Sequence, residues 1–115
     1  MSITIYHNPR CTKSRLTLAL LEEHGLEPDV VLYLETAPTQ AMLKSIAKKL
    51  GLSDIRQMMR TKEAIYGELG LSGVTDDDGL LDAMVKNPIL IERPIVVHGA
   101  KAAIGRPPEN VLEIL

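Results

Sequence analysis

The sequence has no phenylalanine and no tryptophan, and three tyrosines are its only aromatic residues. Its hydrophobic fraction of 45% over 115 residues is enough for a core, so we expect that core to be aliphatic. No apolar run approaches the roughly 20 residues that span a bilayer. The N-terminus also lacks the basic and long apolar regions of a signal peptide. We therefore expect neither a membrane segment nor export.

Cysteine occurs once, at Cys11. A single cysteine forms no internal disulfide and no thiolate-rich zinc site, so we predict no metal and a location in the reducing cytoplasm. The formal net charge of -2, with both signs mixed along the chain, gives no reason to expect a nucleic-acid partner. We find no repeat, low-complexity tract or linker, which favours one domain over residues 1–115, and we expect a monomer.

The first third of the chain is predicted to hold a strand, a helix and a second strand. Residues 3–6 alternate apolar and polar side chains, as a short strand does. A helix follows from Thr12 to about Gly25, with Leu16, Ala19 and Leu20 at helical spacing on its apolar face. The continuous apolar run at residues 30–34 predicts a buried strand.

The middle of the chain is predicted to be helical. Thr39 caps a helix that ends at Gly51, Asp54 caps a short helix, and residues 75–78 form a capping-box pattern before another helix that Asn87-Pro88 ends. A hairpin is expected from residues 95–97 to 102–104. A last helix should bury Val111, Leu112 and Leu115.

The order of these elements predicts the fold class. Two strands joined by a helix are parallel, and the closing hairpin adds antiparallel strands to the same sheet. We therefore expect an α/β protein with a mixed four-stranded sheet, in the topology of a thioredoxin-like fold with a helical insertion in its middle.

Cys11 lies where the first strand meets the first helix. Free amide groups and the positive end of the helix dipole favour an anion there, and Arg10, Lys13 and Arg15 lie in the same turn. These features should lower the pKa of the thiol. They predict a thiolate nucleophile acting on a small oxyanion, rather than a cysteine that merely fills the core. Ser14 is placed to hydrogen-bond the sulfur or the substrate.

Position 14 is serine, so the Cys-x-x-Cys spacing of a redox pair is absent. One cysteine cannot resolve its own adduct as an internal disulfide, and a redox cycle would need an external thiol such as glutathione or glutaredoxin.

Three arginines are candidates for binding the oxyanion. Arg60 ends the short third helix, and Arg93 and Arg106 each precede a proline. Guanidinium presents a planar fork that suits a tetrahedral oxyanion, although spacing alone favours a solvated surface residue for any single one of the three. Arg56 is expected to be such a surface residue. By fold analogy, Pro94 is expected to be a cis-proline that faces the cysteine.

The sequence resembles the glutaredoxin-dependent arsenate reductase (ArsC) family, and more closely its short, YfgD-like branch. The likeness covers nearly the whole chain, with its segments in order. Thr12 and Lys13, where the resistance-type enzymes tend to carry a glycine and a small residue, favour the short branch. The matching segments are residues 5–11, 14–15, 32–35, 59–60, 87–88, 92–97 and 105–107.

The resemblance implies that Cys11 attacks arsenate and forms a thiol-arsenate ester. It implies that Arg60, Arg93 and Arg106 bind the oxyanion and its reduced intermediate. His7, which from its position alone either supports the site or simply ends the strand, would help Ser14 to lower the pKa of the cysteine. Glutathione and glutaredoxin would supply electrons as external reductants, with no bound cofactor.

Two other functions are compatible with the same fold. Regulators of the Spx type bind RNA polymerase and typically carry the Cys-x-x-Cys pair that is lacking between Cys11 and Ser14. A glutathione-dependent thiol reductase acting on another substrate would use the same cysteine.

Overall fold

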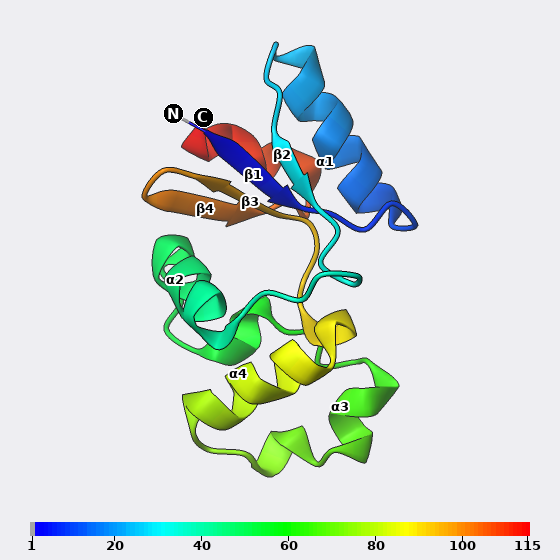
Figure 1. The fold of residues 1–115 in the computed structure, drawn as a ribbon, viewed down its shortest axis with the longest axis vertical. Coiled ribbons are helices and arrows are strands. Elements are labelled where there is room, and N and C mark those ends of the chain that lie inside the picture. Colours follow the sequence, from blue (N-terminus) through cyan, green and yellow to red (C-terminus); the bar gives the residue numbers. More distant parts are fainter. Residues whose placement is uncertain (1) are drawn as a thin grey trace. The chain divides into compact units, whose positions relative to one another are not determined.

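The computed structural model describes residues 2–115, which divide into two compact units. Unit 1 comprises residues 2–36 and 93–115, and unit 2 comprises residues 37–92. The prediction of a single domain remains a prediction. Short 3-10 helices are named η. Unit 1 contains β1 (Ile3–Tyr6), α1 (Thr12–Glu23), β2 (Asp29–Val31), β3 (Ile95–His98), β4 (Lys101–Ile104) and η4 (Pro108–Ile114), and its strands and α1 are labelled in Figure 1.

The sheet of unit 1 has four strands in the order β2-β1-β3-β4. β1 pairs in parallel with β2, through Ile5 and Val30, and antiparallel with β3, through Ile5 and Val96. β3 and β4 form the hairpin, with Val96 opposite Ala103. The mixed four-stranded α/β sheet predicted from the sequence is therefore confirmed.

The main buried cluster of unit 1 is aliphatic, although Tyr6 and Tyr33 are also buried in this unit. Ile3 and Ile5 point to the same face of β1 because side chains alternate along a strand. Val96 of β3, Leu21 of α1 and Val111 of η4 complete the buried cluster. This packing fixes α1, whose first turn follows Cys11, against the sheet.

The predicted apolar face of α1 is only partly correct. Leu20 packs against the core, but Leu16 is 51% exposed, and the buried residues of the helix are Ser14, Thr17 and Leu21. The buried positions follow the helical spacing i, i+3, i+7, but two of them are polar. Ser14 and Thr17 can be buried because their hydroxyl groups have hydrogen-bond partners inside unit 1. A hydrophobic pattern could not reveal that.

The predicted buried strand at residues 30–34 is also wrong. β2 ends at Val31 and is an edge strand with one neighbour, so Val30 is 46% exposed. The carbonyl of Leu32 accepts hydrogen bonds from the amides of Glu35 and Thr36, which bends the rest of the run into a turn. Leu32 and Leu34 are exposed there.

The last helix differs from its prediction in type. It is a 3-10 helix with about three residues per turn, so Val111 and Ile114 lie on the same side and contact the core. Leu112 and Leu115, predicted to be buried with Val111, are 37% and 42% exposed.

Unit 2 is helical, as predicted. Thr39 caps α2 by accepting a hydrogen bond from the amide of Met42, and Gly51 ends this helix in the left-handed conformation. Asp76, one residue later than Thr75, caps α4. Unit 2 contains α2 (Gln40–Leu50), η1 (Ile55–Met58), α3 (Ala64–Glu68), η2 (Leu71–Gly73), α4 (Asp77–Lys86) and η3 (Pro88–Leu90), of which α3, η2 and η3 were not predicted.

Arg56 is not the solvated surface residue expected from the sequence. Its Nε donates to the hydroxyl of Tyr66, and Nη2 donates to the carbonyls of Leu71 and Val74. Tyr66 and burial act in opposite directions on the guanidinium, and the net effect is a raised pKa. Arg56 thus ties η1 to the segments before α4.

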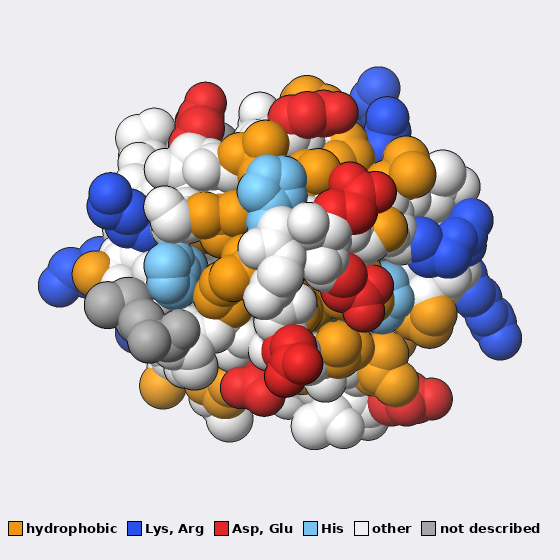
Figure 2. Space-filling view, turned by 90° about the horizontal axis from the view of Figure 1, so that it is seen from above, with side chains coloured by type: hydrophobic (Ala, Val, Ile, Leu, Met, Phe, Trp, Pro, Cys, Tyr) orange, Lys and Arg blue, Asp and Glu red, His pale blue; other side chains and the backbone are white. Residues whose placement is uncertain are grey.

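Among the helices described in residues 2–115, the longest has 12 residues, and none has the length and apolar character needed to cross a membrane. In the face drawn in Figure 2, acidic and hydrophobic side chains occupy the middle, and lysines and arginines lie toward its two sides. No continuous basic stripe crosses that face.

Candidate functional site

Cys11 is the residue that caps the N-terminus of α1. Its backbone is extended, with φ -95° and ψ 123°, and its carbonyl accepts the hydrogen bond from the amide of Arg15 that starts the helix. The first turn of α1 contains no acidic residue, so no carboxylate offsets the positive end of the helix dipole. The thiol therefore lies at a helix end that suits an anion, as predicted.

The pKa of the Cys11 thiol is lowered, although burial by itself raises it. The backbone amide of Ser14, the Arg93 side chain and the amide of Lys13 together outweigh that burial. The amides act without forming a capping hydrogen bond of standard geometry to the side chain. The lowered pKa enriches the thiolate, which is the nucleophilic form.

The side chains of the cations adjacent in sequence are not the main cause of this shift. Arg10 and Arg15 are not among the principal causes of the lowered pKa of Cys11, and Lys13 contributes through its backbone amide. The guanidinium of Arg15 instead donates to the carbonyl of Pro9 at 2.8 Å, and so holds the loop before the cysteine. The cation that acts on the sulfur is Arg93, from a distant part of the chain.

Ser14 and His7 form a buried pair beneath the loop. Ser14 Oγ lies 2.6 Å from His7 Nδ1 and accepts a hydrogen bond from the amide of Asn8 at 3.0 Å. Burial and then the charge of Arg15 lower the pKa of His7, which favours a neutral ring. We assign the Ser14 hydroxyl as the donor to Nδ1, because its oxygen already accepts from Asn8.

This arrangement changes the expected role of Ser14. Its amide acts on the sulfur, while its hydroxyl is engaged with His7 and Asn8. Asn8 also closes the loop: its side-chain oxygen accepts from the amide of Arg10, and its carbonyl accepts from the amide of Cys11. Asn8 precedes Pro9, and an Asn-Pro pair is a known turn signal that marks this loop in the sequence.

Arg93 has the least satisfied side chain of the site. Its Nε and Nη1 are shielded from solvent and have no hydrogen-bond partner among residues 2–115. Buried donors normally have partners, so two guanidinium N–H groups without an acceptor are a strong indication of an anion-binding site. The peptide bond between Arg93 and Pro94 is cis, as expected from the fold.

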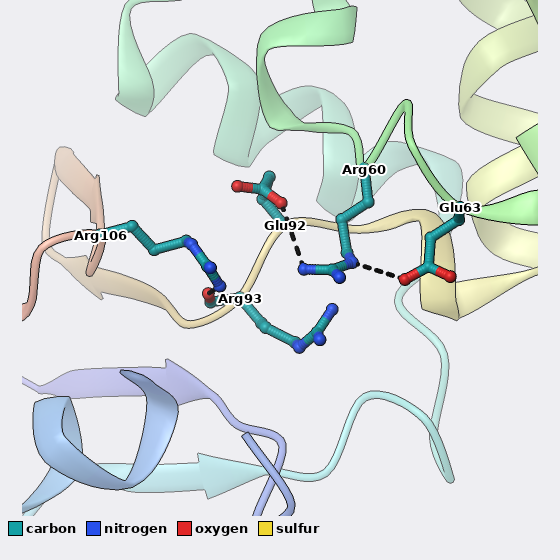
Figure 3. Close-up of polar contacts among 5 residues, drawn as sticks. All are labelled: Arg60, Glu63, Glu92, Arg93 and Arg106. Atoms are coloured by element: carbon teal, nitrogen blue, oxygen red, sulfur yellow. Dashed lines mark hydrogen bonds and ion pairs between the residues drawn. The ribbon is translucent and has the colours of Figure 1, made fainter. Parts of the chain in front are cut away.

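Arg106 lies on the turn that follows β4, and its Nη1 donates to the carbonyl of Arg93 at 3.3 Å (Figure 3). Gly105 places this turn close to α1. A Cβ added at Gly105 would lie 2.5 Å from Thr17 Oγ1 and 2.8 Å from Pro94 Cγ, too close for either. The amide of Gly105 also donates to the carbonyl of Pro94. Sequence patterns did not reveal this close approach.

Arg60 belongs to unit 2, and its side chain is held by two carboxylates (Figure 3). Nε lies 2.9 Å from Glu63 Oε1, and Nη1 lies 3.7 Å from Glu92 Oε1. Its amide donates to the carbonyl of Leu90 at 2.7 Å. Unit 1 thus brings together Cys11, His7, Ser14, Arg93, Pro94 and Arg106, and the part that Arg60 plays remains a prediction. Within residues 2–115, no group of three or more His, Cys, Asp or Glu side chains could hold a metal ion.

Comparison with known proteins identifies a family. The ArsC family model matches residues 6–114. An arsenate reductase of Haemophilus influenzae is 55% identical, with all of both chains covered. The uncharacterized protein YfgD of Escherichia coli is 56% identical over 98% of this chain and 96% of its own length. The structure of an arsenate reductase from Vibrio cholerae matches with a TM-score of 0.97 at 56% identity, over 100% of this chain and 98% of that one.

Proposed function

Because the chain belongs to the ArsC family, we propose that it is an arsenate reductase in which the Cys11 thiolate attacks the arsenic atom. Relatives more than half identical over their full length carry that name. The fold, the helix N-terminus and the lowered pKa of Cys11 are those that such a reaction needs.

The observation that carries the proposal is the unpaired guanidinium of Arg93. Nε and Nη1 are buried without partners, and the same side chain lowers the pKa of the Cys11 thiol. A single side chain therefore holds two buried N–H donors without partners and also acts on the nucleophile. A tetrahedral oxyanion that accepts a hydrogen bond from this guanidinium satisfies a buried donor and is held next to the sulfur.

The proposed first step forms a sulfur–arsenic bond. The thiolate attacks arsenic(V) and an arsenate oxygen leaves as water after protonation, so the oxidation state of arsenic does not change. A thiol from solution then attacks the Cys11 sulfur and breaks the sulfur–arsenic bond. The electron pair stays on arsenic, which leaves as arsenite, and a mixed disulfide remains on Cys11. A second thiol releases the enzyme, so two thiols are oxidised for each arsenate reduced.

The external thiols are required because Cys11 is the only cysteine. We propose glutathione as the first donor and glutaredoxin as the second, in a cytoplasmic protein without a bound cofactor. Arg106 supports Arg93 through the hydrogen bond to its carbonyl and, in this proposal, offers its remaining N–H groups to the anion. Arg60 is proposed as the third arginine, on the sequence resemblance alone.

The test is arsenite production by the wild type and by Cys11→Ser, with glutathione, glutaredoxin and a coupled nicotinamide assay. We expect wild-type turnover and a loss of at least about a thousandfold in the variant, which lacks the nucleophile. Absence of arsenite from the wild type, with the donors shown to be active, would contradict the proposal. Reduction of a glutathionylated substrate in its place would identify a thiol reductase, and retention of RNA polymerase subunits on the protein would identify a regulator.

A further inference from the structure

Unit 1 contains a cleft of about 250 Å³ beside the loop that leads into Cys11. One wall is formed by residues 7–10, and the other is formed by Leu32, Leu34 and Glu35 from the turn after β2. Cys11 follows the first wall directly in the chain and is not itself part of the lining. The anion site described above uses Arg93 and the helix amides, so this cleft is a separate feature.

Both walls are fixed in position without a ligand. On the first, the amides of Asn8, Arg10 and Cys11 and the carbonyl of Pro9 all have hydrogen-bond partners within the loop and α1. On the second, the carbonyl of Leu32 accepts the amides of Glu35 and Thr36. Such a preformed cleft needs little ordering of the chain when it binds a ligand.

The cleft carries one charge of each sign. Arg10 and Glu35 are both exposed, and in residues 2–115 neither belongs to an ion pair. Leu32 and Leu34 add exposed apolar side chains to the lining of the cleft. A ligand that fits this lining has a carboxylate, an ammonium group and a short aliphatic portion.

We propose that this cleft binds the thiol donor through a zwitterionic end, with the carboxylate on Arg10 and the ammonium group on Glu35. This inference rests on the proposed function, because that function requires an external thiol. A γ-glutamyl group carries both charges on one carbon, and a tripeptide extends about 10 Å. A γ-glutamyl peptide thiol held in the cleft therefore reaches the adjacent Cys11 with its own sulfur.

The experiment uses S-methylglutathione, which cannot react, and the full-length ¹⁵N-labelled wild-type protein. We expect saturable amide shifts centred on residues 7–10 and 32–35. Arg10→Ala and Glu35→Gln should each weaken binding by about fivefold, the effect of one exposed charge pair. The matched controls Lys101→Ala and Glu27→Gln remove one exposed charge each from unit 1 outside the cleft, and should leave binding unchanged. N-acetyl-S-methylcysteine lacks the ammonium group, so its affinity for Glu35→Gln should equal its affinity for the wild type.

Several results would overturn the proposal: no saturable shift, shifts centred on the shallow hollow between α1 and residues 107–109, or equal binding by both cleft variants and the wild type. The measurement contains no arsenate and no turnover. Binding in the cleft without arsenate reduction would therefore refute arsenate as the substrate and leave the cleft as a thiol site. Glutathione-dependent arsenate reduction without binding in the cleft would refute the cleft as the thiol site and leave the proposed function.

Discussion

Arg93 of unit 1 differs from the two arginines of unit 2 in how its side chain is used. In unit 2, Arg56 donates to a hydroxyl and two carbonyls, and Arg60 is held by two carboxylates. In unit 1, Arg93 keeps two buried N–H groups without a partner among residues 2–115. Saturated guanidinium groups fix the chain, whereas an unsaturated one retains the capacity to bind an anion. The number of arginines in the sequence gives no hint of this difference.

The N-termini of α1 and α4 differ in a similar way, in whether acidic residues compensate their positive ends. α4 of unit 2 has Asp76 as its cap and two further aspartates in its first turn, which satisfy its amides and dipole. α1 of unit 1 has Cys11 at the cap and no acidic residue in its first turn. The positive end of α1, where Cys11 lies, is thus not compensated by a carboxylate of its own first turn.

The largest effect should come from removing the unsatisfied arginine. We expect Arg93→Ala to lower kcat/KM for arsenate by about a hundredfold, because it removes two buried N–H donors and a group that favours the thiolate. Arg60→Ala should cost about tenfold, since two carboxylates already offset its charge. Steady-state kinetics with saturating thiol donors measures both. A larger loss for Arg60→Ala than for Arg93→Ala would break the comparison between the units.

A second prediction compares one glycine from each unit. In Gly105→Ala the added methyl would press on Thr17 and Pro94, so we expect a loss of about 1–3 kcal/mol of unfolding free energy. Gly67→Ala, in α3, meets no atom within 4 Å and should be neutral or stabilise by up to about 1 kcal/mol. Urea denaturation measures both. Equal effects would show that the close approach at Gly105 is not tight.

The smallest effect concerns His7 and pH. Burial, then Arg15, lower the pKa of folded His7, so the unfolded chain takes up the proton first as pH falls below about 6.5. Stability should therefore decrease as pH falls through that value and level off below the folded pKa. His7→Asn should flatten this dependence in urea denaturation, and the exposed His24→Gln should not. An unchanged slope in His7→Asn would show that another group causes it.

Local patterns predicted most elements of both units. The strand at residues 3–6, the capped helix from Thr39 to Gly51 and the hairpin were read correctly, because each depends on neighbouring residues. Burial was harder to predict. Whether residues 30–34 are buried depends on how many strands flank them, and Val30 and Val31 belong to the edge strand β2. The exposure of Leu16 depends on partners that the hydroxyls of Ser14 and Thr17 find elsewhere.

The position of the site was predicted, and the cause of its lowered pKa was predicted in part. Cys11 lies at a helix N-terminus, as strand and helix patterns indicated, and the amides of that helix lower the thiol pKa, as expected. The sequence also suggested the side chains of Arg10, Lys13 and Arg15, because proximity in sequence was the only available measure. The cation that the fold supplies is Arg93, which β3 pairing with β1 brings to the cysteine.

The central claim is that Arg93 and the helix amides, rather than the cations next to the cysteine in sequence, favour the thiolate. Ultraviolet titration of thiolate absorbance in the wild type, Arg93→Gln and Arg10→Gln tests it most directly, since Cys11 is the only thiol. We predict a wild-type pKa below the ordinary value for cysteine, a raised pKa in Arg93→Gln and little change in Arg10→Gln. An unchanged pKa in Arg93→Gln, or a larger rise in Arg10→Gln, would contradict the account.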